Sequence, residues 1–306
     1  MAKRKNSENI YALQYWPTWL GLGLLRLLSI FPLRVLHWLG GGIGLAVFHL
    51  HKSRRRIAYT NLKSCFPEQD DSTLWLWVKN NFRHIGRGVM CTGFNWYGSG
   101  HRLDRLCQAE GREIIDGLIA EQRRVILLAP HFIALEPGGM WISRQYPTIS
   151  MYQIAKNRCT DHAIRKGRTR YGGELYERGG AMRTLVRRIR QGRLFYYLPD
   201  QDPGRREGVF VPFFGIQTAT FPTLSRFARM SNAVVVPVVT RQLEHGQGWC
   251  IRFYPPIENF PGSDEIEDTE RMNAVIEALI RELPDQYFWV HKRFKSRPEG
   301  EPPFYD

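Results

Sequence analysis

A histidine and a glutamate lie five positions apart in the segment LLAPHFIALEPGG, residues 127–139, directly after an apolar run. Pro130 biases the residue before it toward extended backbone and so ends a strand. The proline after the glutamate suits the first turn of a helix, which leaves residues 131–136 as a connecting turn. In this turn Glu136 can accept a hydrogen bond from one imidazole nitrogen of His131, so that the other acts as a general base. A backbone-bonded histidine beside a solvated glutamate is the simpler alternative, which this segment alone favours.

A cluster of basic residues occupies the segment IRKGRTRYGG, residues 164–173. In an extended segment, Arg168 and Arg170 point the same way and can grip a phosphate, because guanidinium groups bind phosphate oxygens in pairs. Charge clusters are more often a solvated surface, but the two glycines that follow indicate a shaped backbone rather than a helix surface.

Two aspartates, Asp200 and Asp202, follow the strand-like segment RLFYYLP. They can bind a metal or hold arginines in place, or simply form a turn, as Asp-Pro-Gly often does. The chain has no GxSxG motif, no Walker loop and no HExxH motif, so nothing supports a serine hydrolase, a nucleotide hydrolase or a zinc protease.

Elements of two kinds must position these side chains. Short apolar runs predict buried strands, and segments with apolar residues at helical spacing predict helices. The predicted strands are 124–130, 148–155, 193–200, 232–243 and 248–257. The predicted helices are 54–66, 73–90 with Ser72 as N-cap, 110–124, 179–192, 219–231 and 268–284. This alternation predicts an α/β domain with a largely parallel sheet flanked by helices, in which chemistry gathers at the carboxyl ends of the strands.

The first fifty residues differ from the rest. They are almost free of acid, carry Trp16, Trp19 and Trp38, and have basic residues at both ends. Arg26 and Arg34 interrupt the apolar run, and their spacing of eight places them on a similar helical face where they can reach headgroups. We expect residues 1–50 to be a membrane anchor that spans once, forms a hairpin or lies in the interface, and 51–306 to be the catalytic domain. A buried helix pair in a soluble core is the alternative.

Composition narrows the partners. The 306 residues include 43 Lys and Arg against 29 Asp and Glu, a net charge of +14. Such an excess favours an anionic membrane surface, a phosphorylated lipid, an acidic protein or nucleic acid. Nucleic acid is disfavoured because the aromatic residues lie mostly in apolar strands rather than among the basic clusters. The five widely spaced cysteines form no CxxC motif, which argues against a disulfide framework or a zinc site.

Taken in order, these segments resemble the late acyltransferases of lipid A biosynthesis, within the larger lysophospholipid acyltransferase superfamily. The resemblance begins at the tryptophan-rich N-terminal segment and covers nearly the whole chain. Its further motifs are NLKSCFPE, APHFIALE, RTR, YYLPDQDPG, VFVPFFG, VVVPV and QYFWVHKRFKSRPEG. HFIALE is most similar to the lauroyl-transferring branch, which tends to have glutamate where glycerolipid relatives have aspartate.

The resemblance implies a glycerolipid acyltransferase-like fold and a role for each candidate residue. His131 would be the general base and Glu136 would hold it in the right tautomer. Arg168 and Arg170 would contact phosphate on the donor or the acceptor. Asp200 and Asp202 would help to bind substrate, because they stand where glycerolipid acyltransferases have a Pro-Glu-Gly phosphate-site motif.

The resemblance also implies the partners. The donor would be an acyl carrier protein thioester, and the acceptor a 3-hydroxyacyl chain on a phosphorylated lipid A precursor of the Kdo-lipid IVA type. No metal or organic cofactor is expected. The protein would sit on anionic lipid of a bacterial inner membrane with its catalytic domain facing the cytoplasm. A glycerolipid or glycolipid acyltransferase, a basic nucleic-acid-binding protein and a non-catalytic membrane adaptor remain as alternatives.

Overall fold

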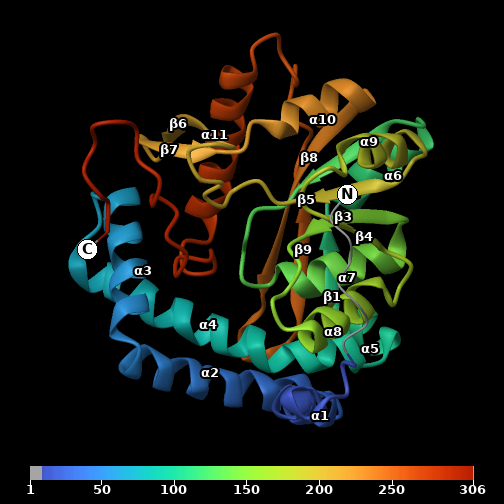
Figure 1. The fold of residues 1–306 in the computed structure, drawn as a ribbon, viewed down its shortest axis with the longest axis vertical. Coiled ribbons are helices and arrows are strands. Elements are labelled where there is room, and N and C mark those ends of the chain that lie inside the picture. The colour runs from blue at the N-terminus through green and yellow to red at the C-terminus, as the bar shows by residue number, and fades with distance from the viewer. Residues whose placement is uncertain (1–8, 306) are drawn as a thin grey trace.

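The computed structural model describes residues 9–305, and the basic residues Lys3, Arg4 and Lys5 lie outside them. The chain begins with a helical layer and continues into an α/β sheet domain (Figure 1). The first five helices are α1 (Trp16–Leu28), α2 (Leu33–Leu50), α3 (Lys52–Cys65), α4 (Asp71–Tyr97) and α5 (Gly100–Leu106). The later helices are α6 (Arg112–Ala120), α7 (Leu135–Gln145), α8 (Arg158–Thr169), α9 (Met182–Arg190), α10 (Thr223–Ser231) and α11 (Glu265–Glu282).

The main sheet has seven strands in the order β1-β9-β8-β2-β5-β3-β4. These are β1 (Cys107–Glu110), β2 (Arg124–Leu128), β3 (Thr148–Tyr152), β4 (Glu174–Glu177), β5 (Leu194–Tyr197), β8 (Ala233–Gln242) and β9 (Trp249–Phe253). The five strands from β8 to β4 are parallel to one another. Strand β9 is antiparallel to β8, and β1 is parallel to β9. A separate hairpin joins β6 (Val209–Phe213) to β7 (Ile216–Thr220). The predicted, largely parallel sheet flanked by helices is confirmed.

Strand β2 lies at the centre of the sheet and is buried on both faces, which explains its uninterrupted apolar sequence. Ile126 and Leu128 pack into one core with α9, α10 and α11, while Val125 and Leu127 pack into the other with α6 and α7. The carboxyl end of β2 therefore lies between two packed layers, next to the carboxyl end of β5 and to Pro237 in the middle of β8.

Helix α2 packs along α4 through small residues. A Cβ atom at Gly44 would lie 2.1 Å from the carbonyl oxygen of Phe82, and one at Gly86 would lie 2.1 Å from that of Gly40. Only glycine permits this approach of two backbones, so Gly40, Gly44 and Gly86 allow α2 and α4 to pack closely.

Several predicted boundaries are wrong. The N-cap of α4 is Asp70, whose carboxylate accepts the Thr73 N–H, rather than Ser72. The helix predicted from residue 219 begins at Thr223, because residues 216–220 pair in the β6–β7 hairpin. Arg26 and Arg34 do not share a helix face, since α1 ends at Leu28 and Pro32 precedes α2.

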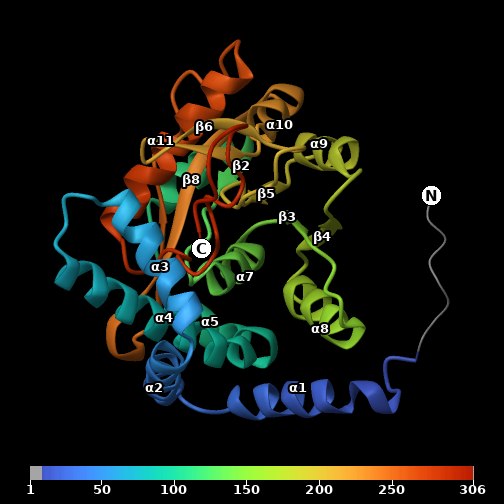
Figure 2. The ribbon, with the colours of Figure 1, turned by 60° about the vertical axis from the view of Figure 1, so that its left-hand side comes forward.

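Helices α1 and α2 lie along one edge of the molecule (Figure 2). Among the described helices, α2 alone is long and apolar enough to cross a membrane by length and composition, and 39% of its residues are buried. Many apolar side chains of this edge are exposed, among them Leu20, which is 75% accessible, and Trp38, which is 77% accessible.

Candidate active site

His131 lies three residues beyond Leu128, the last residue of the apolar strand β2, and directly after Pro130. The Ala129 N–H still donates to the Tyr197 carbonyl of β5, so the two strands run side by side to this point. The chain then leaves the sheet, and His131 is held by a bond from the Phe288 N–H to its carbonyl oxygen, 3.0 Å. This placement agrees with the rule that parallel sheets carry their sites at strand ends.

The imidazole of His131 is oriented by Asp200, which follows β5. Nδ1 of His131 lies 2.6 Å from Oδ1 of Asp200. The other carboxylate oxygen accepts the backbone N–H of His131 at 2.7 Å and the hydroxyl of Tyr287 at 2.8 Å. These bonds leave Nε2 directed away from Asp200, on the side of the ring that can accept a proton.

The carboxylate of Asp200 is only 1% exposed. Burial by itself would raise the pKa of Asp200, but the His131 imidazole and the hydrogen bonds from His131 and Tyr287 outweigh it and lower the pKa to about 2. Burial and the adjacent Asp200 raise the pKa of the Tyr287 hydroxyl well above its ordinary value. The ionised aspartate therefore accepts from Nδ1–H and from a neutral tyrosine.

Glu136 does not contact His131, so the predicted hydrogen bond between them is wrong. Helix α7 already begins at Leu135, which turns Glu136 in the first helical turn toward α8. Its carboxylate accepts Nη2 of Arg168 at 2.6 Å, Nε of Arg168 at 3.0 Å and the indole N–H of Trp96 at 2.8 Å. The paired guanidinium is the stronger partner, and Nδ1 of His131 is occupied by Asp200.

The two arginines predicted to act together are separated. Residues 158–169 form helix α8 instead of an extended segment, so Arg168 and Arg170 point in different directions. Arg168 lines the cavity beside His131. Arg170 lies over the ring of Tyr171 at 4.7 Å and reaches the Asn95 carbonyl at 3.4 Å. Of the pair, only Arg168 belongs to the site.

Both aspartates after β5 are engaged within the protein. Asp202 accepts the backbone N–H groups of Gly204 at 2.7 Å and Ser296 at 2.6 Å, and so shapes the turn after β5. Asp200 orients His131. These bonds do not support the expectation that Asp200 and Asp202 contact substrate, and they favour positioning roles instead.

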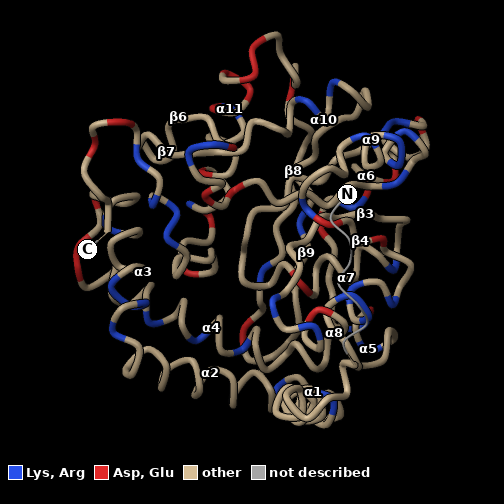
Figure 3. Tube along the Cα trace, in the orientation of Figure 1, with Lys and Arg blue, Asp and Glu red and all other residues tan. Residues whose placement is uncertain are grey.

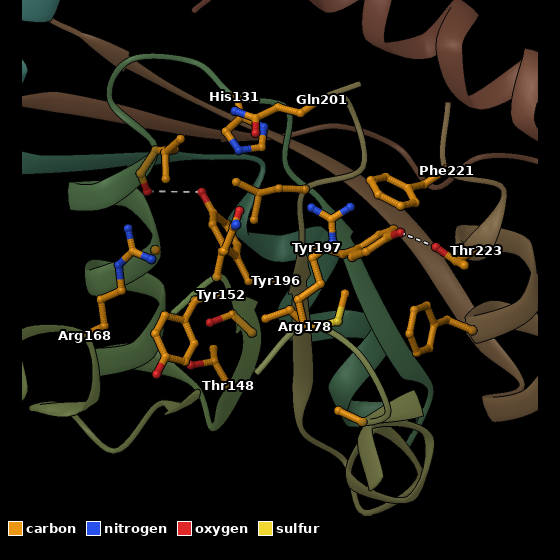
Figure 4. Close-up of a pocket in the computed structure, with 18 of the residues that line it drawn as sticks. His131, Thr148, Tyr152, Arg168, Arg178, Tyr196, Tyr197, Gln201, Phe221 and Thr223 are labelled. Atoms are coloured by element: carbon orange, nitrogen blue, oxygen red, sulfur yellow. Dashed lines mark hydrogen bonds between the residues drawn. The ribbon is translucent and has the colours of Figure 1, made fainter. Parts of the chain in front are cut away.

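A cavity of about 580 Å³ opens beside His131 (Figure 4). Its volume lies within the range of ~300–1,000 Å³ typical of ligand pockets. Tyr196 and Tyr197 of β5 form its wall, and hydrogen bonds hold their hydroxyls to the Leu135 carbonyl and to Thr223. Burial raises the pKa of Tyr197 to about 12, so this wall is uncharged. The cavity lining also contains apolar side chains, namely Leu135, Met140, Met151, Ile164, Met182, Phe221 and Phe227.

Arg178 is a cavity residue that the sequence analysis missed. It directly follows β4, and its guanidinium lies 4.3 Å from the centre of the Phe221 ring. Its one carboxylate partner among the described residues is the exposed Glu207, at 3.5 Å. Gln201 and Tyr287 were also missed. The strand-end rule applied to residues 174–177 and 194–197 would have found Arg178 and Gln201, whereas Tyr287 comes from a distant segment without a local signal.

Comparison with known proteins gives a consistent result. A family model described as bacterial lipid A biosynthesis acyltransferase matches residues 3–296. The chain is 37% identical to the lipid A biosynthesis lauroyltransferase of Escherichia coli K12, over 95% of each chain. It is 32% identical to the palmitoleoyltransferase of the same strain over 95% of each chain, and 28% identical to its myristoyltransferase over 98% of this chain and 95% of that one. A solved 1-acyl-sn-glycerophosphate acyltransferase from Thermotoga maritima aligns with 16% identity and a TM-score of 0.38, over 82% of this chain and 97% of that one.

Proposed function

Because the chain belongs to the bacterial lipid A biosynthesis acyltransferases, we propose that it transfers a fatty acyl chain from an acyl carrier protein thioester to a 3-hydroxyacyl hydroxyl. The acceptor is a phosphorylated lipid A precursor of the Kdo-lipid IVA type. The observation that carries the proposal is the His131–Asp200 pair at the edge of a partly apolar cavity. Lauroyl is the first donor to try, because HFIALE and the 37% identity both favour that branch.

His131 acts as the general base. Its Nε2 takes the proton of the acceptor hydroxyl while the oxygen attacks the thioester carbonyl. The tetrahedral intermediate collapses with cleavage of the C–S bond, and the imidazolium returns the proton to the leaving thiolate. Asp200 keeps the proton on Nδ1 before the step and stabilises the imidazolium during it, as the aspartate of a catalytic triad does.

Glu136 acts through Arg168. The carboxylate holds two nitrogens of the guanidinium, Nε and Nη2, which fixes the plane of the group. Glu136 raises the pKa of Arg168, so the guanidinium stays charged in the lining of the cavity. A fixed positive group there can stabilise the oxyanion of the intermediate or a phosphate of the substrate.

Arg178 is the second cation of the cavity. Among residues 9–305 its guanidinium is held by a ring face and by an exposed carboxylate at 3.5 Å, so it keeps hydrogen-bond donors for a ligand. We assign it to a phosphate of the acceptor or of the donor arm, in place of Arg170.

The exposed apolar edge formed by α1 and α2 supports attachment to the inner membrane, with the catalytic domain on the cytoplasmic side. Its exposed side chains include Leu20, Leu24, Ile30 and Trp38, and tryptophan prefers the membrane interface. The net charge of +14 favours both anionic lipid and an acidic carrier protein.

The test is acyl transfer by purified protein in mixed micelles. Lauroyl-, myristoyl- and palmitoleoyl-acyl carrier protein are each offered with a phosphorylated lipid A precursor, and product is identified by mass spectrometry. Lysophosphatidic acid serves as the competing acceptor. Transfer to lysophosphatidic acid but not to the lipid A precursor would replace this proposal with a glycerolipid acyltransferase, and activity that survives His131→Ala would remove the proposed base.

A further inference from the structure

A second cavity lies outside the active site, between α3 and the C-terminal segment. Its volume is about 320 Å³. Helix α3 contributes Lys52, Ser53, Arg56, Ile57 and Thr60, and the C-terminal segment contributes Lys292, Phe304 and Tyr305. Three of these eight residues are cationic and none is acidic, so the cavity is suited to an anion.

The cations of this cavity differ from the neighbouring arginines. Arg54 donates to the Val290 carbonyl at 3.1 Å, and Arg55 donates to the Phe48 carbonyl at 3.2 Å. Within residues 9–305, by contrast, the side chains of Lys52 and Arg56 make no hydrogen bond or ion pair, and the ammonium group of Lys292 lies 5.2 Å from the centre of the Tyr305 ring. The three charges thus remain available to a ligand.

The walls of the cavity are held in place by a buried amide. Asn61 is fully buried on α3, and its Nδ2 donates to the Trp289 carbonyl at 2.7 Å and to the His291 carbonyl at 2.9 Å. The Tyr305 hydroxyl donates to Oδ1 of the same side chain at 2.5 Å. Both sides of the cavity are therefore fixed before any ligand arrives, which lowers the ordering cost of binding.

The position of the cavity indicates the source of the anion. Leu50, the last residue of α2, is 83% exposed, and Lys52 begins α3 two residues later. Figure 3 shows the change, with α2 almost free of charge and basic residues along α3. Exposed apolar side chains next to a basic cavity match the boundary at which hydrocarbon gives way to lipid headgroups.

We propose that Lys52, Arg56 and Lys292 form a site for the phosphate group of an anionic lipid, at the headgroup level of the membrane. The inference rests on the membrane attachment proposed above but concerns a site distinct from the catalytic cavity. The three cations bind the phosphate oxygens, and the hydroxyls of Ser53 and Thr60 lie in the same lining as further donors.

The test compares two variants with equal loss of charge. Arg56→Gln/Lys292→Gln alters the cavity, and Arg183→Gln/Arg187→Gln alters the exposed face of α9, far from α3 in both ribbon views. Binding is measured by flotation with vesicles of phosphatidylcholine alone or with phosphatidylglycerol. The cavity variant should lose about 30-fold in its partition coefficient on anionic vesicles, about 2 kcal/mol, since each basic residue near such a surface contributes about 1 kcal/mol. Each single variant should lose about fivefold.

The outcomes distinguish a specific phosphate site from a general effect of net charge, and a lipid phosphate from free phosphate. Equal losses in the two double variants, or no loss in the cavity variant, would overturn the phosphate site and reduce the effect to net charge. Binding of wild type to neutral vesicles tests the apolar edge independently, and the cavity variant should keep it. Replacing chloride with inorganic phosphate at constant ionic strength distinguishes the sources. A higher Tm in wild type but not in the cavity variant identifies free phosphate as a ligand, whereas an unchanged Tm with the vesicle effect intact assigns the site to lipid.

Discussion

At the scale of single residues, the pairing of His131 with Asp200 decides how the base works. His131→Ala should lower kcat by about 10²–10⁴ or more, because general-base catalysis typically supplies that factor. Asp200→Asn should be slow as well, since it acts through the same imidazole. The double variant should be no slower than His131→Ala alone, which single-turnover kinetics with acyl carrier protein donor can measure. A double variant much slower than either single variant would contradict the shared role.

The charge of Asp200 also predicts a pH dependence. Its pKa of about 2 keeps it ionised at all working pH values. Loss of this negative charge disfavours the imidazolium, so the acid limb of the kcat/KM profile should move to lower pH in Asp200→Asn.

The depressed pKa of Asp200 also contributes stability that is present above the unfolded value of about 3.9 and is lost as pH falls toward about 2. Wild type should therefore lose stability more steeply than the variant over that range, as acid titration followed by circular dichroism can determine. Equal loss of stability with falling pH in wild type and in Asp200→Asn would contradict an ionised Asp200 in the native protein.

Arg168 and Glu136 make a separate prediction. Arg168→Lys keeps the charge but cannot copy the bond pattern of Nε and Nη2. It should recover only part of the activity lost in Arg168→Ala. Each charge-assisted hydrogen bond that lysine fails to make should cost about 1.5–3 kcal/mol. Glu136→Gln removes the negative charge and one of the two acceptor oxygens that pair with the guanidinium, and it should lower Tm together with kcat/KM. Wild-type Tm and activity in Arg168→Lys would show that the fork is not required.

At the scale of elements, the glycines between α2 and α4 can be tested in pairs. Gly86→Ala would bring Cβ to 2.1 Å from the Gly40 carbonyl oxygen, and the overpacking should lower the free energy of unfolding by about 1–3 kcal/mol or more. Gly42→Ala is the matched control, because nothing lies within 4 Å of its added Cβ. The control should raise helix stability by about 0.5–1 kcal/mol. Similar Tm values for the two variants would contradict close packing of the helices.

The elements also explain which parts of the site were predictable. Strand β2 and His131 at its end follow from an apolar run and a proline, both local signals. The partner of His131 does not follow from a local signal, because Glu136 is close to His131 in the sequence whereas the actual partner, Asp200, is distant in the sequence. The carboxylate five residues away lies on a helix that turns from the imidazole, and the one on the neighbouring strand faces it at 2.6 Å. Strand order, which local patterns do not encode, decides the pairing.

The basic segment around Arg168 shows a second limit. The sequence pattern predicts an extended segment whose arginines grip a phosphate. Instead the segment forms helix α8, and Asn157 caps this helix by accepting the Thr160 N–H. The long-range partners Glu136 and Trp96 then select Arg168 from the cluster. A run of charges indicates an anionic environment, and only tertiary contacts determine which charge faces the substrate.

At the scale of the whole molecule, α2 should lie in the plane of the membrane. It packs along α4 through Gly40, Gly44 and Gly86. If α2 crossed the bilayer, α4 with its Lys79, Arg83 and Arg87 would have to enter the hydrocarbon beside it, at about 2.5–3.5 kcal/mol for each charge at the centre of a span. An interfacial position buries the exposed apolar edge and leaves these charges on the side of the protein.

This orientation predicts equal depths for the two ends of α2. Cysteines introduced at Val35 and Leu50, both exposed, can carry nitroxide labels, and the chain without them is the control because its described cysteines are buried or half-buried. Depth is measured from the ratio of relaxation by oxygen and by a water-soluble nickel complex in vesicles. In-plane binding predicts depths that agree within a few ångströms. A helix that spans the membrane would separate the two labels by about 22 Å, from 15 residues at 1.5 Å each, and a difference of that size would require α2 to separate from α4 on the membrane.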